Sequence, residues 1–146
     1  MKEDFVMRGK TAKGVTETLN FGGHKEGYGF LLTEFTLYPS LNIGNADAEM
    51  TGIITAGKTA LDSDNPNFND EGLIGTTLFA YDANDAYPAS SHTVINDTFV
   101  ITQDLLLTVS NTEASDINWQ CRFRPVKLDT AKQALTNYRQ FMIFDG

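Results

Sequence analysis

The chain has 146 residues, of which 41% are apolar, and it carries 19 acidic against 11 basic side chains, a net charge of −8. This length and apolar content suffice for one buried core, which excludes a wholly disordered protein. The acidic balance argues against direct binding of nucleic acid, because phosphate contacts need a basic surface. No apolar run approaches the about 20 residues that cross a bilayer, so we expect no membrane partner.

The charges are distributed unevenly along the chain. Residues 44–97 contain nine carboxylates and one lysine, a sum of −8, whereas residues 1–13 sum to +2 and residues 118–140 to +4. Such an asymmetry can orient a protein on a surface of opposite potential, or it can simply keep a small domain soluble. Both interpretations are compatible with the sequence.

The N-terminal part of the chain predicts two marginal strands. Residues 1–14 place Phe5 among charged side chains, and they form either an arm that reaches a neighbouring subunit or an edge strand. Residues 15–21 alternate apolar side chains but include Glu17 on the apolar side, which favours an edge strand or a half-exposed strand.

Stronger strand signals follow a glycine-rich turn. Segments with β-branched and aromatic composition, bounded by turn residues, cover 28–38, 48–56, 73–81 and 93–97. A long acidic loop over residues 58–72 separates the second of these segments from the third.

The stretch from residue 96 to residue 128 shows the clearest alternation. Its apolar residues at every second position are Phe99, Ile101, Leu105, Leu107, Val109, Trp119, Cys121 and Phe123. The connection between its two runs is rich in Ser, Asn, Thr and Asp, so we predict that they form a buried hairpin with a long loop. The only cysteine, Cys121, is expected to act as a small core residue.

The second run of this pair also carries the densest basic row of the chain. Arg122 and Arg124 alternate with the inward residues, and Lys127 follows them. We predict that this row binds a partner, together with Arg139 on a C-terminal helix and Phe5 near the N-terminus.

These elements predict a mainly β fold: a single antiparallel, jelly-roll-like β-sandwich of about eight strands with one short C-terminal helix. Asp129 can cap that helix, and residues 141–144 are apolar enough for a last strand. The sandwich would comprise residues 15–146, with residues 1–14 as its arm or edge strand. Periodicity does not encode strand order, so a jelly roll and other sandwiches of this size are both compatible with the pattern.

The acidic loop is a candidate metal site. Its Asp62, Asp64, Asn67 and Asp70 offer oxygen ligands of the kind that calcium prefers, although their spacing is not that of an EF-hand. The alternative is a solvated turn, in which Asp and Asn side chains bond their own main chain.

The sequence contains no recognisable set of catalytic residues. Neither His24 nor His92 has a metal ligand or a nucleophile at a useful spacing, so we expect no catalytic residue, no cofactor and no enzyme activity. Aromatic residues that could form a sugar-binding platform are Tyr81, Tyr87, Trp119 and Tyr138. The position of Trp119 in an alternating strand favours a core role instead.

Three segments carry a resemblance to a known class of proteins. They are LNFGGHKEGYGFLLTEFTLYPS, NDTFVITQDLLLT and NWQCRFRPVKL. In these segments the chain resembles small structural proteins of marine tailed bacteriophages. The resemblance implies a β-rich virion component on the capsid exterior, a decoration or cement protein bound to the major capsid protein or other virion subunits, and it implies no particular site residues.

A shell-bound role would suit the uneven charge, and on symmetry grounds we expect a homo-oligomer, with a trimer as the specific prediction. The alternative function is a carbohydrate- or receptor-binding β-sandwich, either on a phage fibre or as a free lectin-like protein.

Overall fold

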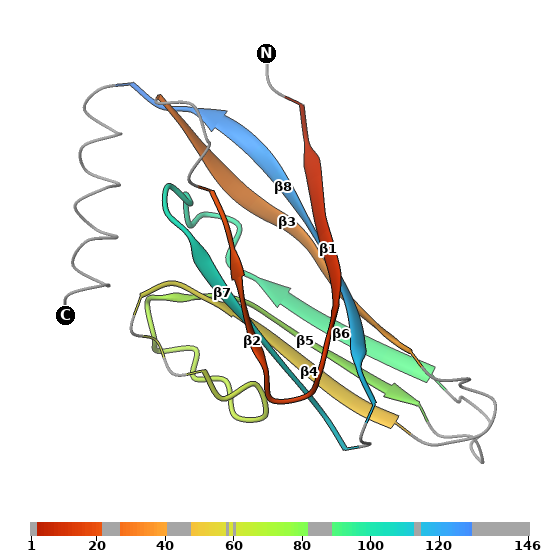
Figure 1. The fold of residues 1–146 in the computed structure, drawn as a ribbon. Coiled ribbons are helices and arrows are strands. Elements are labelled where there is room, and N and C mark those ends of the chain that lie inside the picture. The colour runs from red at the N-terminus through yellow and green to blue at the C-terminus, as the bar shows by residue number, and fades with distance from the viewer. Residues whose placement is uncertain are drawn as a thin grey trace.

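Eight strands arranged in two antiparallel sheets make up the fold of the chain (Figure 1). The computed structural model describes residues 3–21, 27–40, 48–57, 59, 61–81, 89–112 and 115–129. The strands are β1 (Phe5–Thr11), β2 (Thr16–Leu19), β3 (Tyr28–Pro39), β4 (Ala48–Thr55), β5 (Leu73–Tyr81), β6 (Ala89–Ile95), β7 (Leu105–Asn111) and β8 (Ile117–Lys127). The predicted mainly β sandwich is therefore confirmed, while the predicted helix and last strand lie outside the described residues.

The strand order identifies the sandwich as jelly-roll-like. One sheet has the order β1-β8-β3 and the other β2-β7-β4-β5-β6, so the first strand pairs with the last, the second with the seventh and the fourth with the fifth. This nested pairing is the arrangement of a rolled-up antiparallel ribbon. Strand β6 pairs with β5 at the edge of the larger sheet. It also contacts β3 of the other sheet, where the Thr93 hydroxyl donates to the Phe35 carbonyl oxygen at 3.1 Å.

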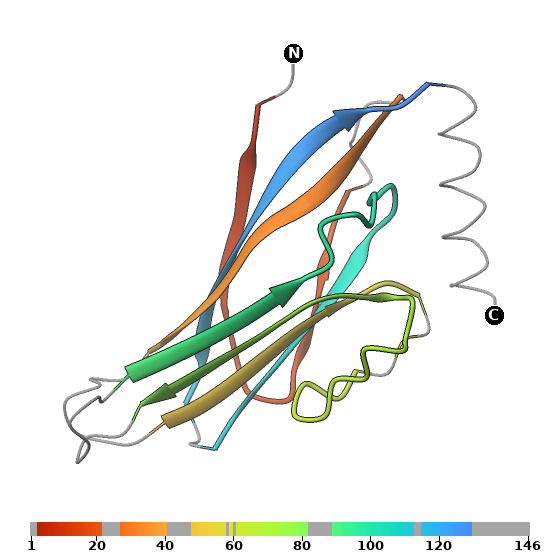
Figure 2. The same ribbon diagram turned by 180° about the vertical axis from the view of Figure 1, so that it is seen from behind.

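The predicted hairpin over residues 96–128 is wrong. Strand β7 lies between β2 and β4, whereas β8 lies between β1 and β3 in the opposite sheet (Figures 1 and 2). The two strands therefore present their apolar faces to each other across the core, and their connection leads from one sheet to the other. Alternation specifies which face of a strand is buried but not its hydrogen-bonding partner, so both arrangements give the same sequence pattern.

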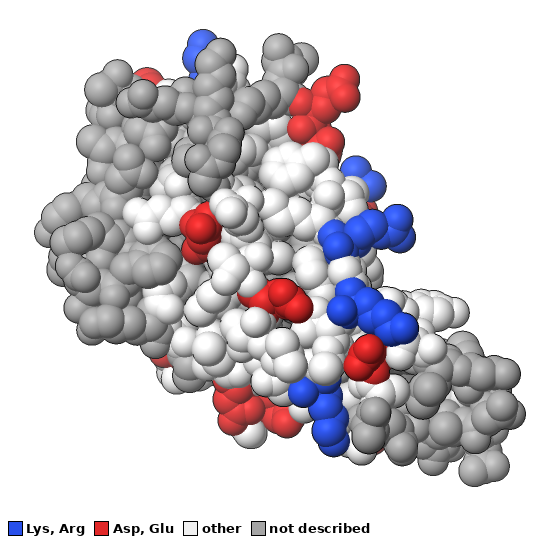
Figure 3. Space-filling view, viewed as in Figure 1, with Lys and Arg blue, Asp and Glu red and all other residues white. Residues whose placement is uncertain are grey.

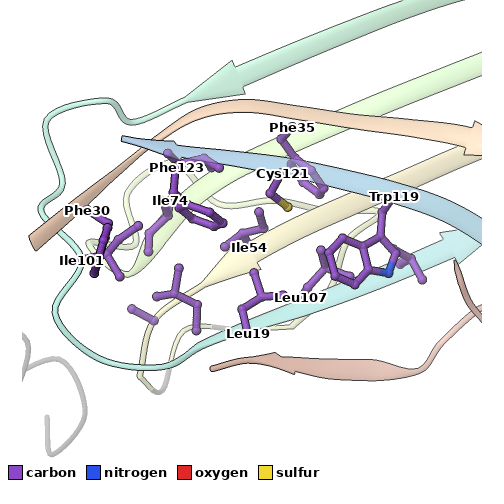
Figure 4. Close-up of a cluster of buried hydrophobic side chains, with 14 of the residues drawn as sticks. Leu19, Phe30, Phe35, Ile54, Ile74, Ile101, Leu107, Trp119, Cys121 and Phe123 are labelled. Atoms are coloured by element: carbon purple, nitrogen blue, oxygen red, sulfur yellow. The ribbon is translucent and has the colours of Figure 1, made fainter. Parts of the chain in front are cut away.

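The core lies between the inner faces of the two sheets (Figure 4). Phe35, Cys121 and Phe123 from the smaller sheet meet Ile54 and Leu107 from the larger one, and all five side chains are almost completely buried. Burial of each large apolar side chain favours folding by about 1.5–3 kcal/mol. The predicted core role of Cys121 is confirmed, and burial raises the pKa of its thiol, which keeps it neutral.

Both N-terminal segments form edge strands. Strand β1 pairs with β8 along its whole length, so residues 5–11 form an edge strand of the smaller sheet. In β2 the exposed Glu17 accepts a hydrogen bond from the Thr11 hydroxyl at 3.2 Å. An edge strand tolerates this carboxylate on its inner side because solvent reaches it there.

Candidate functional site

The outer face of the three-stranded sheet gathers most of the described cations. In each of its strands the residues that alternate with the core residues point outward, and the register aligns them in rows across β1, β8 and β3. These rows are Lys10–Asn118–Tyr38, then Arg8–Gln120–Thr36, then Val6–Arg122–Glu34, with Arg124 beyond them. We call this set of residues the basic face.

A glycine and a tryptophan position the first two rows. Gly9 lies between Arg8 and Lys10 and turns toward the core, where the Trp119 indole covers it so closely that an added Cβ would lie 2.8 Å from Cζ2. The indole N–H donates to the Thr11 hydroxyl at 2.9 Å. These contacts hold β1 against β8 and thereby fix the two cations on the sheet.

The first two rows line a hollow with a volume of about 610 Å³. Its outward side chains are Arg8, Lys10, Thr36, Tyr38, Asn118 and Gln120. Tyr38 is 60% exposed, and its ring leans toward Phe79 of β5, with a centroid separation of 6.3 Å and an interplanar angle of 45°. The hollow therefore combines cations, amides and one aromatic edge.

The four cations of the basic face differ in their counter-ions. The Arg122 guanidinium donates from Nε to Glu34 at 3.1 Å, and Arg124 Nε lies 3.8 Å from the Asp4 carboxylate. Within the described residues, neither Arg8 nor Lys10 forms a salt bridge. Figure 3 shows Lys and Arg gathered along one side of the molecule, over β1 and β8.

The opposite face of the sandwich is acidic. Residues 61–72 pack on the outside of the five-stranded sheet, where the Thr51 hydroxyl contacts Ser63 at 3.1 Å and Asp64 at 2.9 Å. This segment carries four carboxylates and no basic residue. The fold thus separates positive and negative charge onto its two outer faces.

The same loop held the predicted calcium ligands. Asp62 accepts hydrogen bonds from the Asp64 amide N–H and the Asn65 side-chain amide, each at 3.1 Å. Asn67 accepts one from the Asn69 N–H at 3.0 Å, and the Asp70 N–H donates to the Asn67 carbonyl oxygen. These bonds are those of local turns, and nowhere in the described ranges do three His, Cys, Asp or Glu side chains gather as they would around a metal.

The remaining residues singled out from the sequence lie apart. His92 is exposed on β6, and His24 is outside the described residues. Trp119 is only 8% exposed, which confirms its core role. Tyr81 is partly buried at the end of β5, while Tyr87 and Tyr138 lie outside the described residues.

The structure brings together only part of the predicted partner-binding set. Arg122 and Arg124 belong to the basic face. Lys127 pairs with Tyr28, but it is an odd number of residues from Arg124 and so does not continue the outward row. Arg139 is outside the described residues. The Phe5 ring stacks on Phe123 at 5.5 Å, inside an aromatic cluster of its own chain.

Sequence reasoning missed Arg8, Lys10 and Tyr38. The signal for the two cations was present, because Val6, Arg8 and Lys10 alternate with Phe5 and Met7 in the sequence. What the sequence did not reveal was that this short strand pairs with the basic strand β8.

In the described part of the chain, no helix has the length and apolarity needed to cross a membrane. The chain matches neither any known family model nor any curated protein.

Proposed function

We propose that this protein is a structural component of a bacteriophage virion, a decoration protein that binds the outside of the shell through its basic face. The observation that carries the proposal is the separation of charge: four cations and two carboxylates on one outer face, four carboxylates on the other. A jelly-roll-like sandwich and the resemblance of three segments to phage structural proteins support it.

The separated charges would select one orientation on the shell. An acidic shell surface attracts the basic face and repels the acidic loop over residues 61–72, so wrong orientations are disfavoured during encounter. The protein, as a homo-oligomer such as a trimer, would then contact adjacent capsid subunits and oppose their separation. Binding to the assembled state stabilises that state by mass action, and this role requires neither a catalytic residue nor a cofactor.

The direct test uses particles of the virus that encodes this chain. Cryo-electron microscopy is expected to show the sandwich on the capsid exterior, with the acidic loop outward. Shells assembled without the chain are expected to open at a lower temperature than complete shells. When the salt concentration is lowered stepwise, they are also expected to open earlier, at a higher salt concentration. Shells of equal resistance, or a chain missing from purified particles, would contradict the proposal.

A second candidate is carbohydrate binding, which one observation favours. The exposed Tyr38 stands beside the amides of Asn118 and Gln120 in the hollow, and aromatic rings with neighbouring amides are groups that contact sugars. A glycan array separates the two candidates, because a decoration protein is expected to give no sugar-specific signal while still binding shells stoichiometrically.

A further inference from the structure

We infer that Arg8 and Lys10, rather than Arg122 and Arg124, anchor the basic face to an acidic, extended segment of the shell protein, with carboxylates two residues apart. This inference rests on the proposed function and names the residues and the partner chemistry of the same face.

The first argument is the state of the four cations. Arg122 and Arg124 already have carboxylate partners in Glu34 and Asp4, so a new carboxylate must compete with an existing one. Arg8 and Lys10 have no such partner within the described residues. An incoming carboxylate therefore meets no competing carboxylate of the described residues at these two side chains, so it keeps the modest attraction of an exposed ion pair with each.

The second argument is spacing. Arg8 and Lys10 are two residues apart on one face of β1, which places their Cα atoms about 6.8 Å apart. Alternate side chains of an extended partner segment have the same spacing. Gln120 pairs with Arg8 across the sheet, and its side-chain amide can both donate to and accept from a main chain laid over the hollow.

Other classes of partner fit less well. Nucleic acid is bound through many phosphate contacts, each made by a Lys or Arg, whereas the described part of this face offers two cations without a salt bridge. A neutral sugar could contact the exposed Tyr38 ring, but it would bring no negative charge to Arg8 and Lys10. The outward positions from Asn118 to Arg124 extend over about 20 Å of strand, a length suited to a protein surface.

The test measures binding of the chain to shells that were assembled without it. The double variant Arg8→Gln/Lys10→Gln is expected to bind about tenfold more weakly than the unaltered chain. The single variant Lys13→Glu changes the net charge by the same amount in the adjacent exposed turn, and it is expected to bind normally. The pair Arg122→Gln/Glu34→Gln leaves the net charge unchanged and is also expected to bind normally.

A chemical readout locates the contact directly. A carbodiimide joins an amine to a carboxylate only when the two touch, forming an amide with loss of water to the reagent. Lys10 is expected to be joined to Asp or Glu of a shell subunit, identified by mass spectrometry of the cross-linked peptides. Lys13 serves as the internal comparison and is expected to remain unmodified.

The outcomes separate this inference from the proposed function. If the unaltered chain does not bind shells, the proposed function itself fails. If it binds and Arg8→Gln/Lys10→Gln binds equally well, or weakens no more than Lys13→Glu, the inference alone is overturned. Binding to oligogalacturonate or duplex DNA that disappears in the Arg8→Gln/Lys10→Gln variant would likewise overturn the inference, since the hollow would then serve a different anion.

Discussion

A buried hydrogen bond fixes the only tryptophan at the inner side of the basic face. The Trp119 N–H donates to the Thr11 hydroxyl, and both residues are buried. We expect Thr11→Val to lower the free energy of unfolding by about 1–3 kcal/mol, because the variant leaves the indole N–H without its acceptor and also removes the longer hydrogen bond to the exposed Glu17. Urea unfolding followed by Trp119 fluorescence measures this change.

The matched control for that substitution is Thr18→Val. Thr18 is exposed on the edge strand β2, so the same chemical change there is expected to alter the free energy of unfolding by less than about 0.5 kcal/mol. Equal effects of the two substitutions would show that the buried hydrogen bond contributes nothing of its own.

We expect the buried Cys121 thiol to make the stability depend on pH. Burial raises its pKa in the folded chain, whereas the unfolded chain releases this proton above about pH 8.5. A group whose pKa is higher in the folded chain contributes stability that is fully present below its unfolded pKa. This stability is lost as the pH rises from the unfolded pKa toward the folded pKa. We expect the free energy of unfolding to fall by up to about 1.4 kcal/mol per pH unit above about pH 8.5.

Urea titrations between about pH 8 and 9.5 test this dependence below the range where Tyr and Lys titrate. Cys121→Ala is the control, because a chain without the thiol is expected to lack this slope even if it is less stable throughout. A slope that persists in Cys121→Ala would assign the dependence to another group.

At the scale of elements, β1 packs on the sandwich of its own chain. Its Phe5 ring contacts Phe30 edge-on at 5.3 Å and stacks on Phe123. We expect Phe5→Ala to lower the free energy of unfolding by about 2 kcal/mol at every protein concentration, because the lost contacts are within one chain. Val6→Ala on the outer side is expected to cost less than about 1 kcal/mol.

Chemical denaturation at two well-separated protein concentrations distinguishes the alternatives. If Phe5 instead inserted into a neighbouring subunit, the loss would appear as a shift in the oligomer dissociation constant, with unchanged stability of the monomer.

The strands were predicted from the sequence more reliably than their pairing. The predicted strand over 28–38 agrees with β3 to within one residue, and the inward side chains of β8 were correctly assigned. Strand β6 spans residues 89–95 and not the predicted 93–97. Its start was missed because Ala89, Ser90 and Ser91 are small, exposed residues without the alternation that signals burial. The basic face was only half predicted, because Arg8 and Lys10 join it through the pairing of β1 with β8.

At the scale of the whole molecule, the proposed attachment is electrostatic and should depend on salt. The screening length falls from about 10 Å at 0.1 M salt to about 3 Å at 1 M, so exposed charges on the basic face lose most of their attraction. We expect the amount of chain that sediments with shells to decrease steadily over this range. The Arg8→Gln/Lys10→Gln variant should show a shallower dependence, and attachment unaffected by salt would contradict an electrostatic docking face.

The sequence by itself determined the β class, the buried faces of the strands and the uneven distribution of charge, because these depend on local alternation and composition. Only the tertiary structure decided the nested strand order, the placement of β7 and β8 in opposite sheets, and the union of four cations on one face. These features depend on which strands pair across long sequence separations. Alternation with a period of two is the same for a hairpin and for two strands that face each other across a core.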